Sequence, residues 1–163
     1  MKNPRSQRAV FLDRDGTIIE DADYLTSSEE LSLLPGVVEA LKRLRRPGLL
    51  LIVVTNQSAV ARGWLTENRL HKIHRDLQDM LKAEGAQVDD FLYCPHLPDG
   101  DVQEYAVDCS CRKPSPGLFE RAVEKWNIET GRSFAVGDSE RDVQAGQAAG
   151  CYSILLSKDP PST

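Results

Sequence analysis

The chain has 163 residues, 40% of them hydrophobic and 28% charged, which is typical of one globular domain with a substantial core. Its formal net charge is −5 and it contains no long basic block, which argues against binding to a nucleic-acid backbone. The longest apolar run, 49–54, is too short to span a membrane, and no apolar segment of signal-peptide length follows the polar opening at 1–8. We therefore expect a cytoplasmic protein.

Strands and helices are predicted to alternate along the chain. Short apolar runs predict strands at 9–12, 49–54, 91–93, 134–136 and 151–156. Apolar residues at helical spacing predict helices at 37–46, 66–84 and 140–149, and another that opens at 115–117. Because such alternation gives a parallel sheet covered by helices on both faces, we predict a three-layer, Rossmann-like, doubly wound α/β fold. We expect one domain, 1–163, with its core at about 9–156 and a frayed Pro-rich tail at 157–163.

Polar side chains follow the carboxyl ends of three predicted strands. Asp13 and Asp15 come after the first strand, Thr55 and Asn56 after the second, and Asp138 after the fourth. The ligand crevice of a doubly wound sheet lies at these carboxyl ends. We therefore expect these five residues to form one site.

The chemistry of this expected site is that of a metal beside a phosphate. Asp13, Asp15 and Asp138 are hard oxygen ligands of the kind that Mg²⁺ prefers, and Asp142 could touch the metal or lie behind it. Lys113 supplies a fixed positive charge for an anionic substrate. Each residue taken alone has a simpler explanation as a turn, a helix cap or a solvated lysine, so the prediction depends on their combination.

Four motifs in this order resemble the haloacid dehalogenase-like phosphatase superfamily, over about residues 9–156. They are Asp13-Arg14-Asp15-Gly16-Thr17, Val54-Thr55-Asn56-Gln57-Ser58, Arg112-Lys113-Pro114 and Val136-Gly137-Asp138-Ser139. The resemblance implies a phosphomonoesterase in which Asp13 is the nucleophile that forms an aspartyl-phosphate. It also implies that Asp15 is the general acid–base and that Thr55 and Lys113 stabilise the phosphate. Mg²⁺ would be held by Asp13, the backbone carbonyl of Asp15, and Asp138.

Cysteines and a histidine follow the third predicted strand, in the segment 94–111. Cys94, His96, Cys109 and Cys111 provide three thiolates and one imidazole, a closed tetrahedral set that suits structural Zn²⁺. The alternative is a group of buried cysteines without metal. A zinc-pinned loop would fix the chain directly before Arg112 and Lys113. Disulfides are not expected without a secretion signal, and the remaining Cys151 is expected to be buried.

This loop narrows the resemblance to the heptose-bisphosphate phosphatases and the histidinol-phosphate phosphatases, which lack a large cap domain. The resemblance implies a small phosphorylated sugar or related phosphomonoester as substrate, with Arg112 contributing to its recognition. The implied substrate-binding residues are Asp21, Ala22, Asp23, Tyr24, Thr55, Asn56, Gln57, Ser58, Arg112 and Lys113.

Three departures from the family pattern bear on the substrate more than on the reaction. Ile19 stands where the family often has Asn, Ala59 where it usually has Gly, and Ser139 where the heptose-bisphosphate phosphatases have Lys. Two alternatives remain open at this point: a histidinol-phosphate phosphatase, and a non-catalytic, zinc-stabilised phosphate-binding module. No long apolar stripe is left unassigned in the sequence, so we expect a monomer.

Overall fold

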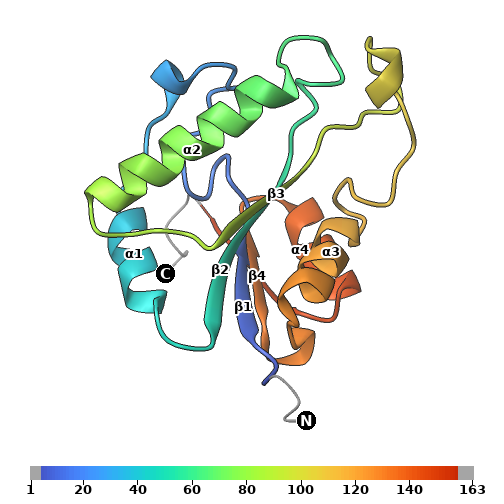
Figure 1. Ribbon diagram of the computed structural model, residues 1–163. Coiled ribbons are helices and arrows are strands. Elements are labelled where there is room, and N and C mark those ends of the chain that lie inside the picture. Colours follow the sequence, from blue (N-terminus) through green and yellow to red (C-terminus); the bar gives the residue numbers. More distant parts are fainter. Residues whose placement is uncertain (1–4, 158–163) are drawn as a thin grey trace.

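A five-stranded parallel sheet forms the centre of the computed structural model, which describes residues 5–157 (Figure 1). The strands lie in the order β3-β2-β1-β4-β5. Their bounds are β1 Arg8–Leu12, β2 Leu49–Asn56, β3 Asp90–Cys94, β4 Phe134–Gly137 and β5 Tyr152–Leu155. All five predicted strands are therefore confirmed. The tail that was predicted to be frayed lies, apart from Ser157, outside the described residues.

Helices cover both faces of the sheet, which confirms the three-layer prediction. In Figure 1, α1 and α2 lie on one side of the strands and α3 and α4 on the other. The bounds are α1 Val37–Leu44, α2 Glu67–Ala83, α3 Gly117–Trp126 and α4 Glu140–Ala148, with short 3₁₀ turns η1 Ser28–Glu30, η2 Gln103–Tyr105 and η3 Thr130–Arg132. None of the helices in the described range is long and apolar enough to cross a membrane.

Side chains of the central strands alternate between two apolar clusters, as the period of two in a strand requires. Val10 and Leu12 of β1 pack in the cluster beneath α1 and α2. Ala9 and Phe11 point to the opposite face, where the rings of Phe11 and Phe119 lie 4.7 Å apart. Because both faces are buried, β1 and β2 read as continuous apolar runs in the sequence.

Helix ends follow local sequence signals and lie within two residues of the predicted bounds. Thr66 caps α2, since its hydroxyl accepts a hydrogen bond from the Arg69 amide at 3.2 Å. Helix α1 ends at Leu44 instead of residue 46, because Arg45 is already extended with φ −67° and ψ 117°. Pro47 disfavours helical backbone at Arg46, the residue before it, so the helix could not have reached the predicted bound.

The outer edge of the sheet exposes apolar side chains. Phe134, Tyr152, Ile154, Leu155 and Leu156 are each at least 40% exposed. The expectation of a monomer assumed that no apolar stripe was left unassigned, and this edge does not meet that assumption. The oligomeric state itself stays a prediction.

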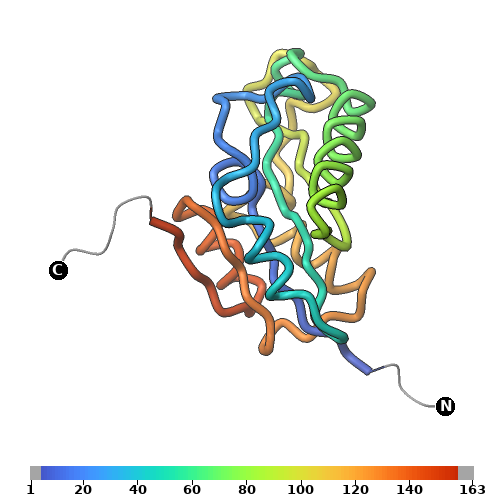
Figure 2. Tube along the Cα trace, turned by 90° about the vertical axis from the view of Figure 1, so that its left-hand side faces the viewer, coloured from blue at the N-terminus to red at the C-terminus, as the bar shows by residue number. Residues whose placement is uncertain are grey.

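The strand order places a crevice above the sheet. Strands β1 and β4 are neighbours, and the chain order reverses between them, which is the point where doubly wound folds bind ligands. The loops that follow β1, β2 and β3 gather beyond the carboxyl ends of the strands in both views (Figures 1 and 2). Asp13 follows β1 directly, and its amide donates to Val136 O of β4 at 3.0 Å.

Candidate active site

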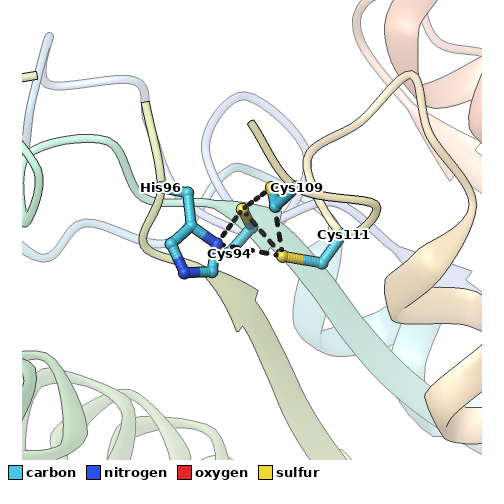
Figure 3. Close-up of side chains that lie close together, drawn as sticks. All are labelled: Cys94, His96, Cys109 and Cys111. Carbon is cyan, nitrogen blue, oxygen red and sulfur yellow. Dashed lines mark hydrogen bonds between the residues drawn. The ribbon is translucent and has the colours of Figure 1, made fainter. Parts of the chain in front are cut away.

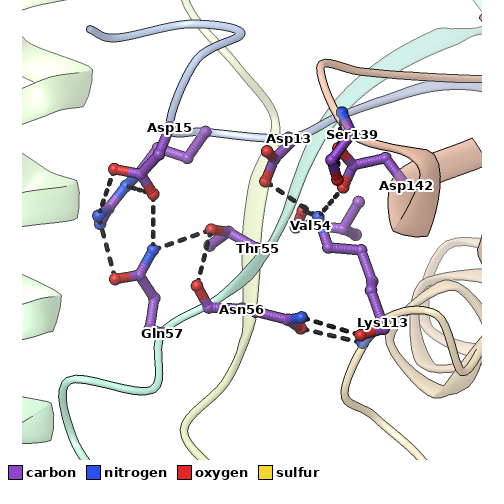
Figure 4. A network of polar contacts seen from close by, with 10 residues as sticks. Asp13, Asp15, Val54, Thr55, Asn56, Gln57, Lys113, Ser139 and Asp142 are labelled. Carbon is purple, nitrogen blue, oxygen red and sulfur yellow. Dashed lines mark hydrogen bonds and ion pairs between the residues drawn. The ribbon is translucent and has the colours of Figure 1, made fainter. Parts of the chain in front are cut away.

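Lys113 and two carboxylates form the centre of the site (Figure 4). The buried Lys113 ammonium donates to Asp13 Oδ1 at 2.9 Å, to Asp142 Oδ1 at 2.6 Å and to the Val54 carbonyl at 2.8 Å. An ammonium group has three N–H donors, so all of them are used within the protein. Lys113 therefore offers its charge to a ligand, and it must release one contact before it donates to a phosphate oxygen.

Asn56 fixes the backbone that carries this lysine. Its side-chain oxygen accepts from the Lys113 amide at 3.0 Å, and its side-chain nitrogen donates to the Lys113 carbonyl at 3.1 Å. Asn56 is the last residue of β2, one residue beyond Thr55. The sequence placed both residues after the strand, but the structure extends β2 through them, so the sheet itself holds the clamp on Lys113.

The Asp13 carboxyl is harder to ionise than an ordinary aspartate. Burial raises its pKa from 3.8 to about 6, the charges of Asp142 and Asp15 add to this, and Lys113 opposes it. A carboxylate held in this way is poorly solvated and lies beside a cation. Such a group gains from any further positive charge brought to the site.

Asp15 lies on the other side of Asp13 from Lys113 in Figure 4, and a separate cation holds it. The buried Arg14 guanidinium donates to both Asp15 carboxylate oxygens, at 3.1 and 3.0 Å. Gln57 donates to Asp15 Oδ2 at 2.9 Å and to Thr55 Oγ1 at 2.9 Å, while its oxygen accepts from Arg14 at 3.0 Å. The two aspartates of the first motif therefore have different partners and different surroundings.

Helix α2 supports this arrangement from behind. His74 Nε2 accepts from Arg14 Nη1 at 3.1 Å, and the His74 ring stacks on Phe91 with centroids 4.7 Å apart. Burial, together with the Arg14 charge, lowers the His74 pKa to about 3, so the ring is neutral and accepts a hydrogen bond. The sequence analysis quoted Arg14 within the first motif without giving it a role, and it did not mention His74. A charged residue between two aspartates and a histidine on an apolar helix stripe have no distinctive signal.

Three carboxylates converge where β1 and β4 end. One oxygen each from Asp13, Asp138 and Asp142 lies within 4.8 Å of the others. Gly16, at φ +83°, permits this approach, because a Cβ at that position would overlap the Asp138 carboxylate. Hard oxygen donors grouped in this way fit Mg²⁺. Asp142 thus lies in the same carboxylate group as Asp13 and Asp138, the two side chains predicted to bind the metal. The Asp15 carboxylate is not in this group and accepts hydrogen bonds from Arg14 and Gln57.

A pocket of about 310 Å³ opens above these groups. All but one of the predicted catalytic and substrate-binding residues line it, namely Asp13, Asp15, Asp21, Asp23, Tyr24, Thr55, Asn56, Gln57, Ser58, Arg112 and Lys113. Ala22 is not among the lining residues. The remaining lining residues, which the sequence analysis did not assign to substrate, are Arg14, Leu25, Ala59, Arg62, Asp138, Ser139, Arg141 and Asp142.

The departures from the family pattern occupy three different surroundings. Ile19 is fully buried in the cluster beneath α1 and α2 and does not line the pocket. Ala59 is buried and lines the pocket. Ser139 caps α4: its amide and hydroxyl both donate to Asp142 Oδ2, at 3.1 and 3.0 Å. Ser139 thus orients the Asp142 carboxylate, which holds Lys113. Two residues after Ser139, Arg141 brings a positive charge to the pocket.

Cys94, His96, Cys109 and Cys111 meet in a second cluster (Figure 3). The separations among their sulfur and Nδ1 atoms include 3.1 Å for Cys94–Cys111, 3.3 Å for His96–Cys111 and 3.5 Å for Cys94–Cys109. A zinc ion with bonds of about 2.3 Å would give edges near 3.8 Å, so the four atoms approximate that tetrahedron. Hydrogen bonds from Cys94 and His96 lower the Cys111 pKa to about 5, which favours the thiolate that binds zinc.

The segment between these ligands has little regular structure of its own. It contains the single turn η2, and the Val102 amide donates to the Ala61 carbonyl at 2.9 Å. Glu67 of α2 accepts hydrogen bonds from the Tyr93 and Tyr105 hydroxyls at 2.6 and 2.7 Å, which ties the segment to α2. All four cysteines are free of disulfides and Cys151 is buried, as predicted.

Comparisons with known proteins define the class. The sequence profile of the haloacid dehalogenase-like hydrolase family matches residues 20–150. The chain belongs to this family and is a hydrolase, which confirms the resemblance inferred from the four motifs.

Named relatives are more specific than the family. A D-glycero-beta-D-manno-heptose-1,7-bisphosphate 7-phosphatase of Rhodopseudomonas palustris is 41% identical over 87% of this chain and 79% of that protein. A D-glycero-alpha-D-manno-heptose-1,7-bisphosphate 7-phosphatase of Photorhabdus laumondii is 38% identical over 93% of this chain and 82% of that protein. The D,D-heptose 1,7-bisphosphate phosphatase of B. bronchiseptica, solved with magnesium and phosphate, aligns with a TM-score of 0.80 at 36% identity, over 91% of this chain and 80% of that one.

Proposed function

We propose that this protein is a phosphatase that removes the 7-phosphate of D-glycero-D-manno-heptose 1,7-bisphosphate, acting in the cytoplasm. The observation that carries the proposal is the contact between Asp13, the expected nucleophile, and the buried Lys113 ammonium at 2.9 Å, on the wall of a pocket. The names of the relatives supply the substrate. Those relatives include enzymes named for either anomer, so the proposal does not choose between them.

The reaction has two displacements at phosphorus. In the first displacement Asp15 must carry a proton. An Asp13 oxygen attacks, the bond to the sugar oxygen breaks, and Asp15 gives that proton to the leaving alkoxide. Asp15 then takes a proton from water, whose oxygen attacks the phosphorus and frees Asp13 and inorganic phosphate. The Arg14–Gln57 network orients Asp15 for both transfers, and Lys113 exchanges one of its three contacts for a phosphate oxygen.

Charge repulsion explains why the site needs cations. A carboxylate and a phosphate oxygen at ~4 Å repel each other by about 4 kcal/mol per unit pair at an effective dielectric constant near 20. Asp13, Asp138 and, among the backbone groups, the Asp15 carbonyl would hold Mg²⁺, which would supply charge neutralisation at the phosphate. Both Asp142 oxygens already accept hydrogen bonds from Lys113 and Ser139, so we assign Asp142 to positioning Lys113.

Magnesium affinity should depend on pH through Asp13. Its pKa near 6 means that the carboxyl is protonated below about pH 6 in the metal-free protein, and a proton must then leave before the metal binds. We expect the apparent affinity to fall about tenfold for each pH unit below 6 and to level off above it. Mg²⁺-dependent melting temperatures measured from pH 5 to 8 would show this, and an affinity that is constant over that range would contradict it.

Side-by-side turnover distinguishes the proposed substrate from the histidinol phosphate alternative. A cationic amino alcohol would favour the acidic groups Asp21 and Asp23 on the pocket wall, whereas a sugar bisphosphate would favour the arginines there. We expect kcat/KM for the heptose bisphosphate to exceed that for histidinol phosphate by at least about 100-fold. A higher kcat/KM for histidinol phosphate would make that compound the substrate in place of the heptose bisphosphate. If the protein hydrolysed no phosphate ester at all, the proposal that it is a phosphatase would be refuted.

A further inference from the structure

Arg62 lines the pocket and lies beside two exposed aromatic rings that touch each other. Its guanidinium carbon lies 5.2 Å from the centroid of the Tyr24 ring and 5.3 Å from that of Trp64. The two rings meet edge to face at 5.0 Å, and both are more than 40% exposed. Such cation–π contacts orient a guanidinium by its planar faces and leave the N–H groups at its edge free to bind.

The hydrogen-bond donors of Arg62 are unused in residues 5–157. Its guanidinium makes no hydrogen bond or ion pair there, and Nε is buried without a partner. Arg14, in the same pocket, has its donors engaged with Asp15, Gln57 and His74. Burying Nε without an acceptor is costly, because that donor loses its contact with water and gains no partner in return.

Two other cations of the pocket are already held by carboxylates. Lys113 faces Asp13 and Asp142, and Arg14 faces Asp15. Among residues 5–157, three arginines that line the pocket make no ion pair: Arg62, Arg112 and Arg141. Arg112 donates to the His96 carbonyl at 3.4 Å, whereas Nε of Arg62 is buried without a partner, so Arg62 is the arginine that most lacks an acceptor. The loop carrying Arg62 is braced on one side by Ala61, whose carbonyl accepts the Val102 amide of the cysteine-rich segment.

We propose that Arg62 is a specificity-determining residue that binds the second, non-transferred phosphate of a sugar bisphosphate. This inference rests on the proposed function and adds to it the reason that a bisphosphate is preferred to a monophosphate. A guanidinium presents two parallel N–H groups that match two phosphate oxygens, and the aromatic contacts hold that fork in place before the ligand arrives.

Binding to an inert protein tests this directly. In an Asp13→Asn background, calorimetry with D-glycero-D-manno-heptose 1,7-bisphosphate and with the corresponding 7-phosphate compares two ligands that differ by one phosphate. Adding Arg62→Gln should raise the Kd for the bisphosphate about 10- to 100-fold, and at least tenfold more than the Kd for the monophosphate. Arg62→Lys should fall between, because an ammonium keeps the charge and loses the fork.

The matched control is Arg69→Gln, an exposed arginine on α2 that does not line the pocket. It should leave the ratio of the two Kd values as it was, and circular dichroism checks that each variant is folded. Equal losses for both ligands, with Arg62→Gln folded, would assign Arg62 to loop structure and overturn the inference. Failure of the Asp13→Asn protein to bind either sugar phosphate would instead refute the proposed function, and the inference with it.

Discussion

An Asp13→Asn protein should hydrolyse phosphate monoesters at least about 1,000-fold more slowly than the wild type, because an amide oxygen is a poor nucleophile. Loss of activity should not come from loss of structure. The substitution removes a carboxylate that is costly to ionise, since burial and Asp142 raise its pKa to about 6. In the absence of Mg²⁺ at pH 8, the variant should therefore melt at the same temperature as the wild type or higher.

This pairing of lost activity with retained stability separates a catalytic role from a structural one. Asp79→Asn, at an exposed position on α2, is the matched control and should keep both turnover and melting temperature. Steady-state turnover of an aryl phosphate and thermal melts supply the two readouts. A variant that keeps more than a tenth of wild-type turnover would show that Asp13 is not the nucleophile.

Cys109→Ala should remove zinc and weaken both stability and catalysis. The segment 95–110 has one short turn, so a metal bound by four ligands would contribute much of its order. Losing several kcal/mol would lower the melting temperature by on the order of 10 °C for a chain of this size. Turnover should fall about 10- to 100-fold, because the segment runs directly into Arg112 and Lys113.

Zinc content by atomic absorption, thermal melts and turnover would be measured on the same preparations. Cys151→Ala is the matched control: Cys151 is buried like Cys94 but lies outside the cluster, so this variant should keep its zinc. The prediction fails if Cys109→Ala protein without metal retains wild-type turnover. Zinc bound at full stoichiometry in that variant would also contradict it.

The fold was predictable because its central strands are buried on both faces. A short, continuous apolar run such as 49–54 is typical of a strand buried on both faces. The alternation of strands and helices then predicts a parallel sheet. Boundaries were less predictable. Strand β2 continues through polar Thr55 and Asn56 because they pair with β3, a long-range contact that no local pattern encodes.

The site was predictable as a set of motif residues and less so as a network. Asp13, Lys113 and Asp138 could be proposed from the sequence because they follow strand ends or belong to a motif. The support from His74 and the stacking of Arg62 depend on contacts between segments far apart in the chain. The sequence also could not predict that all three N–H donors of Lys113 are used within the protein, because this depends on where Val54 and Asp142 lie in the fold.

The cysteine-rich segment connects these networks. It ends at Cys111, two residues before Lys113, and its Val102 amide holds the chain just before Arg62. Gly117, at the start of α3, packs so closely on Ser110 that a Cβ would overlap its carbonyl. One metal site could therefore position the lysine at the transferred phosphate and the arginine proposed for the other one.

Trapping the covalent intermediate tests the central claim most directly. Protein mixed with substrate and Mg²⁺ would be quenched in acid within the first turnover, reduced with borohydride and digested, and the modified carboxyl located by mass spectrometry. We predict modification at Asp13, and none in an Asp13→Asn sample treated in the same way. Modification at Asp15, or full turnover with no modified carboxyl at any quench time, would contradict the proposed mechanism.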